Sequence, residues 1–156
     1  MAPEPGFAGA TLRTWSRGPA PGLFLSDLRG RDFRLEDYRG TVVLVHFWAT
    51  WCEPCREEMP SLEKLKRRFT GRPLLVVAVN VDEPEARIRK FLAQFPLSFP
   101  ILLDPGRQAT KAWNVRLMPT TFVIGADGRI RYAASGGLDW SAPEVVERIA
   151  DLFGKG

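Results

Sequence analysis

The stretch Phe47-Trp48-Ala49-Thr50-Trp51-Cys52-Glu53-Pro54-Cys55 contains both cysteines of the chain, three positions apart. If the residues from Glu53 onward are helical, this spacing places the two Cα atoms roughly 5 to 6 Å apart, within disulfide range. Cys52 then lies at the helix N-terminus, where unpaired N–H groups and the helix dipole favour a thiolate. Cys55 lies one turn further in and should be more buried and less ionised. The pattern therefore predicts that Cys52 attacks a disulfide and Cys55 resolves the intermediate.

Length and composition indicate one domain with a full core. The chain has 156 residues, of which 45% are hydrophobic, and a net charge of +4. Its basic residues are scattered among 18 acidic ones, so we expect no nucleic-acid partner. We also expect a monomer. No apolar run approaches the roughly 18 residues of a membrane span, and residues 1–22 lack the apolar core of a signal peptide. From these patterns we expect a soluble chain without a targeting sequence.

Two cysteines in a chain of this length exclude a disulfide-rich scaffold. The C-x-x-C spacing beside a strand-to-helix pattern is typical of a redox motif. Structural zinc needs four ligands, and the chain offers only these cysteines and one histidine, His46, in an apolar run. We predict no metal site and no cofactor beyond the redox-active disulfide.

The order of elements predicts an α/β fold. Proline and glycine are frequent in residues 1–22, which we expect to form an irregular arm. The rest predicts a central mixed sheet flanked by helices. Expected strands cover residues 41–48, 74–79 and 99–103, with a β-hairpin over residues 23–35. Residues 115–124 are expected to be a loop that runs into a strand, and a further strand follows the turn at 126–129 and ends near residue 135. Expected helices cover 53–69, 83–94, 106–113 and 142–153.

These motifs together resemble the thioredoxin superfamily. They are the segments 47–50 and 51–55, Pro60 inside the following helix, and the distant Met118-Pro119-Thr120. The N-terminal hairpin and a helix-strand insertion over residues 84–103 make the chain more similar to the TlpA/ResA-like branch of bacterial envelope thiol-disulfide oxidoreductases. The resemblance implies a thioredoxin-like domain over residues 23–156, following the arm of residues 1–22.

By position, the resemblance implies roles for the residues of the site. Cys52 matches the family nucleophile, Cys55 the resolving thiol and Pro119 a cis-proline that faces the disulfide. The backbone of Met118 would then meet an incoming substrate strand, which pairs by β-augmentation.

Trp51 and Pro54, beside the cysteines, are expected to belong to the same substrate-binding surface. Glu53 should oppose the thiolate and make Cys52 less acidic than in strongly oxidising relatives.

Two further residues are candidates for proton transfer or for tuning of the thiol pKa. Glu58 matches an acid that members of this branch keep beside the cysteines, although a solvated acid on a helix surface explains it equally well. His46 stands where thioredoxin has a buried aspartate. Its strand neighbours are large and apolar, so we expect a buried, neutral ring without a charged partner. It is either a proton relay for Cys55 or a core histidine whose N–H bonds a carbonyl.

The predicted function is thiol-disulfide exchange, with the protein acting as a reductant of protein disulfides through a Cys52/Cys55 cycle. The resemblance implies cysteine-containing protein substrates such as apocytochrome c or other envelope proteins, an upstream thiol reductant, and a periplasmic or cell-envelope location; the location is cytoplasmic if Met1 is the native start. One alternative is a non-catalytic interaction module whose cysteines only staple a helix end. A peroxiredoxin-type peroxidase would need a different arrangement around its cysteine.

Overall fold

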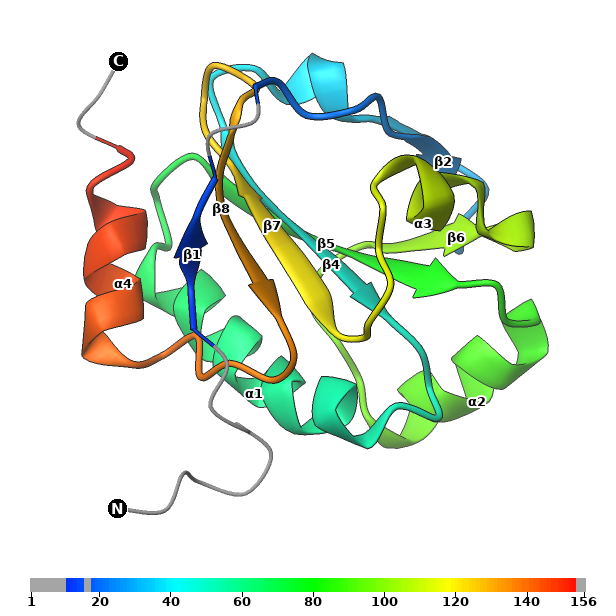
Figure 1. Ribbon diagram of the computed structural model, residues 1–156. Helices are drawn as coiled ribbons and strands as arrows, with labels where there is room; N and C mark the ends of the chain where they lie inside the picture. The colour runs from blue at the N-terminus through cyan, green and yellow to red at the C-terminus, as the bar shows by residue number, and fades with distance from the viewer. Residues whose placement is uncertain (1–10, 16–17, 154–156) are drawn as a thin grey trace.

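The computed structural model describes residues 11–15 and 18–153. These residues form a six-stranded mixed sheet in the order β1-β8-β7-β4-β5-β6, and a separate hairpin of β2 and β3 (Figure 1). The strands are β1 (Arg13–Thr14), β2 (Phe24–Ser26), β3 (Asp32–Arg34), β4 (Val42–Trp48), β5 (Leu74–Val81), β6 (Ile101–Asp104), β7 (Thr120–Ile124) and β8 (Ile130–Ser135). The helices are η1 (Leu35–Tyr38), α1 (Glu53–Arg68), α2 (Glu85–Gln94), η2 (Pro105–Arg107), α3 (Gln108–Ala112) and α4 (Pro143–Ala150).

Strand β4 lies at the centre of the sheet, and all of its residues are buried. It pairs parallel to β5 on one side and antiparallel to β7 on the other. A strand covered on both faces and both edges has no polar side to present to water, which explains its almost continuous apolar sequence. The carboxyl end of β4 leads directly into the turn that carries Cys52, so the cysteines lie where open α/β sheets place their sites.

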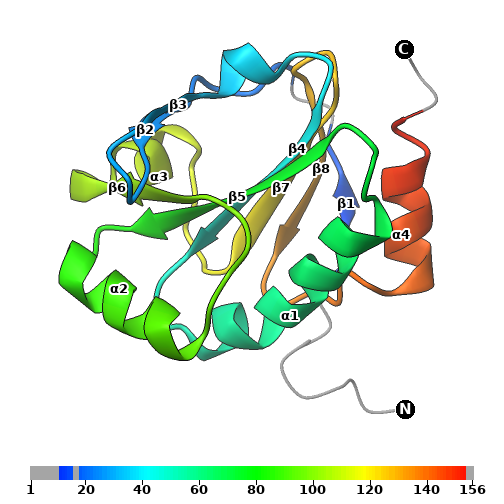
Figure 2. The same ribbon diagram turned by 180° about the vertical axis from the view of Figure 1, so that it is seen from behind.

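Helices cover both faces of the sheet (Figure 2). One apolar cluster joins α1, α2 and α4 to the face of β4 that carries Leu44 and Trp48. The opposite face, with Val45 and Phe47, packs against α3 and the β2–β3 hairpin. The side chains of β4 therefore alternate between two cores, and the even-numbered residues, His46 among them, face α1.

The predicted α/β fold is confirmed, including the hairpin and the helix-strand insertion, which α2 and β6 form. The irregular arm predicted for residues 1–22 is wrong at Arg13–Thr14. These two residues pair with β8 and extend the sheet by one edge strand. Trp15 follows them and packs edge-on against Phe122, with the ring centroids 5.6 Å apart. Residues 1–10 and 16–17 of the predicted arm lie outside the described residues, and the boundary at residue 22 stays a prediction.

In the described part of the chain, no helix combines the length and the apolar character that crossing a bilayer requires.

Candidate active site

The two cysteines form a disulfide at the start of α1, with their Cα atoms 5.3 Å apart. Cys52 is the N-cap residue of α1, and its sulfur accepts a hydrogen bond from the backbone N–H of Cys55 at 3.3 Å. Pro54 occupies the first turn, where a missing N–H costs no helical hydrogen bond. The predicted position of Cys52 at the helix N-terminus is therefore confirmed. The backbone N–H of Cys55 is in place to stabilise a thiolate there.

The exposure of the two cysteines differs less than we expected. Cys55 is fully buried, as predicted, but Cys52 is only 4% exposed in the disulfide. Its side chain turns toward Cys55 and belongs to the apolar cluster beneath α1. The neighbouring Trp51 is the exposed side chain, at 66%.

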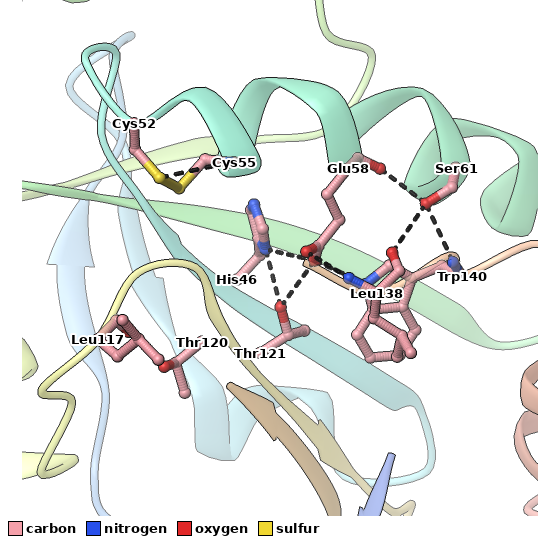
Figure 3. A network of polar contacts seen from close by, with 10 residues as sticks. All are labelled: His46, Cys52, Cys55, Glu58, Ser61, Leu117, Thr120, Thr121, Leu138 and Trp140. Atoms are coloured by element: carbon pink, nitrogen blue, oxygen red, sulfur yellow. Dashed lines mark hydrogen bonds and ion pairs between the residues drawn. A yellow bond between two sulfur atoms is a disulfide. The ribbon is translucent and has the colours of Figure 1, made fainter. Parts of the chain in front are cut away.

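His46 lies on β4 beneath the disulfide and is completely buried (Figure 3). Its Nδ1 lies 2.8 Å from the hydroxyl of Thr121, its cross-strand neighbour on β7, and 3.5 Å from Oε1 of Glu58. The prediction of a buried, neutral ring agrees with the loss of solvent around it, which lowers the pKa of His46 to about 3. Glu58 reaches the ring from α1, a neighbour that the sequence did not indicate.

Glu58 is buried too, at 1% exposure, so the explanation of a solvated helix acid is wrong. Its carboxyl accepts hydrogen bonds from the indole N–H of Trp140 at 2.7 Å, the backbone N–H of Leu138 at 3.1 Å and the hydroxyl of Thr121 at 3.4 Å. Burial outweighs these bonds and raises the pKa of Glu58 to about 8.

His46 and Glu58 form a coupled acid–base pair rather than a salt bridge. Although Nδ1 and Oε1 are within ion-pair distance, burial disfavours the charged form of each group, so near pH 7 both are neutral and Glu58 holds the proton. The other ring nitrogen, Nε2, has no hydrogen-bond partner among the described residues and faces the disulfide (Figure 3). The ring of His46 therefore lies between the underside of the disulfide and the buried carboxyl group of Glu58.

The predicted substrate-binding residues fall into two groups. Trp51 and Pro54 are exposed beside the disulfide, as is Glu53. The Met118–Pro119 bond is cis, as the resemblance implied, with Pro119 buried and Met118 half-buried. In the same loop, Leu117 is 55% exposed.

Sequence reasoning missed several residues that complete the site. Thr121 and Trp140 bind Glu58, and Glu83 binds Thr50 in the turn before Cys52. The cross-strand pairing of Thr121 with His46 depends on the antiparallel register of β4 and β7, which no local pattern reveals. Glu58 was already a candidate, and its burial could have been predicted too, because it shares a helix face with the apolar residues Met59 and Leu62.

Comparisons with known proteins identify relatives of this chain. The family model described as "AhpC/TSA family" matches residues 17–133. Thiol-disulfide oxidoreductase ResA of Geobacillus thermodenitrificans is 43% identical over 117 residues, which cover 75% of this chain and 67% of that protein. ResA of Geobacillus kaustophilus is 42% identical over 129 residues, which cover 83% and 72% of the two chains.

Solved structures extend the comparison to the fold. A crystal structure from Chlorobium tepidum, assigned as a thiol:disulfide interchange protein DsbE, superimposes with a TM-score of 0.74 at 33% identity, covering 86% of this chain and 92% of that one. A protein of Bacteroides thetaiotaomicron, assigned as a protein disulfide isomerase, gives a TM-score of 0.79 at 25% identity, covering 88% and 89%. With its C-x-x-C disulfide at the start of α1, the chain belongs to the AhpC/TSA family, among the thioredoxin-like thiol-disulfide oxidoreductases of the ResA type.

Proposed function

We propose that this protein reduces disulfide bonds in other proteins through a dithiol-disulfide cycle of Cys52 and Cys55. The single observation that carries the proposal is the disulfide at the N-terminus of α1, directly above the buried pair of His46 and Glu58. A disulfide that only stapled the helix end would not need a titratable pair beneath it.

The cycle begins from the dithiol form. The thiolate of Cys52 attacks one sulfur of the substrate disulfide, and the other substrate sulfur leaves as a thiolate that takes a proton from water. Cys55 then loses its proton and attacks the sulfur of Cys52, which restores the Cys52–Cys55 disulfide and releases the second substrate sulfur. Two electrons pass to the substrate, so an upstream thiol reductant must regenerate the dithiol before the next cycle.

In the second step, Nε2 of His46 accepts the proton of Cys55, and the ionised form of Glu58, 3.5 Å from Nδ1, stabilises the imidazolium that results. In the tautomer that carries hydrogen on Nδ1, the ring donates to Thr121 and leaves Nε2 as the acceptor that faces the disulfide. When an upstream reductant opens the disulfide, the proton returns to Cys55 along the same path. A group of this kind is typically worth about 10² to 10⁴ in rate.

The substrate approaches over the surface formed by Trp51, Pro54 and the loop before β7. Both edges of β7 are already paired, to β4 and β8, so a substrate strand cannot join the sheet there. β-Augmentation is therefore limited to the backbone at Leu117 and Met118, ahead of Thr120. The exposed side chains of Trp51 and Leu117 supply apolar contact area for the residues that flank the substrate cysteine.

The direction and the setting of the reaction follow from the motif and the resemblance. Glu53 beside Cys52 opposes the thiolate, so the reduced form is stabilised less than in a dedicated oxidant, and a less stable dithiol is the better reductant. We place the protein in the cell envelope, with cysteine-containing proteins such as apocytochrome c as clients and a second thiol protein as the electron source.

The proposal is tested by insulin reduction with dithiothreitol as the electron source. Wild-type protein should reduce insulin with turnover, Cys52→Ser should be inactive, and Cys55→Ser should accumulate a mixed disulfide with the substrate. Equilibration in glutathione and dithiothreitol buffers should give a potential nearer about −270 mV than about −120 mV. Absence of insulin reduction would leave only a structural disulfide, and a potential above about −180 mV would overturn the reductant direction.

A further inference from the structure

A second carboxylate, Glu83, lies at the active-site turn and has no part in the cycle described above. Its Oε1 accepts the backbone N–H of Thr50 at 2.7 Å, and its Oε2 accepts the hydroxyl of the same residue at 2.5 Å. The two residues are 33 positions apart in the chain, and Glu83 belongs to the connection between β5 and α2. Both carboxylate oxygens are thus used on a single residue of the turn.

The surroundings of Glu83 hold its carboxylate in one position. The Nδ2 group of Asn80, which is 1% exposed, donates to Oε1 at 2.8 Å. Arg87 lies 3.8 Å from Oε2, and the side chain of Glu83 is only 3% exposed. All of these contacts come from donors, the pattern that an acceptor-only carboxylate satisfies. Because the Glu83 side chain is buried and both of its oxygens are hydrogen-bonded, it has little freedom to move. It therefore fixes the position of the turn that contains Thr50.

Thr50 is a central residue of the turn that presents the nucleophile. The backbone N–H of Cys52 donates to the carbonyl of Ala49 at 3.2 Å, which makes Thr50 and Trp51 the two middle residues of this turn. Trp51 is largely exposed, and Cys52 is the N-cap of α1. The orientation of the whole turn therefore depends on what fixes Thr50.

We propose that Glu83 is a positioning residue for thiol-disulfide exchange, which clamps Thr50 and so keeps Cys52 at the N-cap of α1 and Trp51 toward the substrate while the disulfide opens and closes. The inference rests on the proposed function, because it concerns the same site. Once the disulfide is reduced, the covalent link between the first turn of α1 and the turn before it is gone. The hydrogen bonds of Glu83 then remain to hold that turn.

The clamp predicts the sign of a change in thiol chemistry. Stabilisation of the Cys52 thiolate depends on its place at the helix N-terminus, so release of the turn should move the pKa of Cys52 up toward the ~8.5 of a free thiol. Removal of a nearby negative charge alone would move this pKa down. Position and charge therefore act in opposite directions and can be separated.

The chain offers a matched control further along α1. Glu63 accepts the backbone N–H of Ser98 at 3.2 Å and the Ser98 hydroxyl at 2.8 Å, the same kind of contact across 35 residues. Ser98 lies in the connection before β6, away from the active-site turn. Glu63→Gln therefore removes an equivalent loop clamp without touching the turn that carries Cys52.

The experiment compares Glu83→Gln, Thr50→Ala, the conservative Thr50→Ser and the control Glu63→Gln in the full chain. Iodoacetamide alkylation of reduced protein across pH gives the pKa of Cys52. Insulin reduction gives kcat and KM, and urea unfolding gives stability. We expect Glu83→Gln and Thr50→Ala both to raise the pKa of Cys52 and to lower kcat/KM for insulin by about tenfold or more, with Thr50→Ser and Glu63→Gln close to wild type.

Other results would overturn the clamp. A lower pKa of Cys52 in Glu83→Gln with no change in Thr50→Ala would make Glu83 a charge effect only. Thiol pKa values and kcat/KM equal to those of Glu63→Gln would make the contact purely structural. Because wild-type insulin reduction is measured in the same series, its absence would refute the proposed function, whereas its presence with unaffected Glu83→Gln would refute the clamp alone.

Discussion

Two carboxylates of this protein, Glu58 and Asp104, are equally hidden from water, each at 1% exposure, yet their surroundings differ completely. Asp104 accepts the backbone N–H groups of Ala109 and Thr110 and the Thr110 hydroxyl, all from the start of one helix. Glu58 instead draws its hydrogen bonds from β7 and from the segment before α4, and it lies against His46.

The difference separates a structural acid from a chemical one. Backbone N–H groups in the first turn of a helix have no partner within the helix. Asp104 accepts two of them and so holds the start of α3 against β6. Glu58 shares its site with a second titratable group, and burial raises its pKa to about 8. Burial of a carboxylate is therefore weak evidence for function by itself. A neighbouring base and access to the reacting sulfur provide the stronger argument.

The largest effect expected from this comparison is on catalysis at Glu58. Glu58→Gln keeps an oxygen for the Trp140 indole but can no longer release or take up a proton. Resolution of a mixed disulfide on Cys52 should slow by about a hundredfold, with the fold retained. Stopped-flow release of the second substrate thiol measures this step. An unchanged rate would place Glu58 in the same class as Asp104.

The reciprocal change, Asp104→Asn, should affect stability and leave chemistry intact. The amide replaces one acceptor oxygen with a donor that faces an N–H group of α3, at a cost of about 1 to 3 kcal/mol in the free energy of unfolding. Urea unfolding of the oxidised protein gives this value, and the rate of the resolving step, per folded molecule, should match wild type. A slower resolving step in this variant would erase the distinction between the two acids.

The dependence of stability on pH sharpens the comparison further. The pKa of His46 is lowered from 6.5 to about 3, so between these values the unfolded chain binds more protons and stability rises with pH. The pKa of Glu58 is raised from 4.5 to about 8, so the folded protein binds more protons there and stability falls as pH rises.

The two contributions to the free energy of unfolding cancel between pH 4.5 and 6.5. Above pH 6.5 only Glu58 contributes, and stability falls. That fall has a limiting slope of about 1.4 kcal/mol per pH unit. Urea unfolding across pH should show a decline from 6.5 to 8 in wild type that is absent in Glu58→Gln. Parallel profiles for the two proteins would contradict the raised pKa.

A smaller effect is expected at the ring that connects Glu58 to the sulfur. His46→Asn and His46→Leu should slow the resolving step by about tenfold or more near pH 7. The loss should shrink at higher pH, where Cys55 ionises without help. The same stopped-flow assay, with stability measured alongside, checks both variants. Equal rates in two folded variants would reject the relay and leave His46 as a core residue bonded to Thr121.

Much of this architecture could be predicted from the chain because it depends on local pattern. The apolar run of β4, the C-x-x-C spacing and the helix that follows each occupy consecutive residues, and the structure has all three. The edge strand Arg13–Thr14 escaped prediction because two residues carry no periodicity. The resemblance, rather than any pattern, supplied the cis bond before Pro119.

The partners that distinguish Glu58 escaped prediction for a different reason. Trp140 and Leu138 lie 82 and 80 residues further along the chain, and nothing in their local sequence marks them as donors to an acid. Glu83 was read as a helix-start residue, whereas α2 begins at Glu85 and the Glu83 side chain turns to Thr50. Contacts of this range depend on how strands and helices pack, which periodicity does not encode.

The distance in sequence between Glu58 and its donors has a consequence for the order of events during synthesis. The cysteines and Glu58 leave the ribosome well before Leu138 and Trp140, which lie 80 and 82 residues later. A growing chain can therefore close its disulfide while the groups that shape the environment of Glu58 are still missing. The site reaches its mature form only when the segment that carries Leu138 and Trp140 has folded, so a nascent chain would exchange disulfides before its acid–base pair is buried.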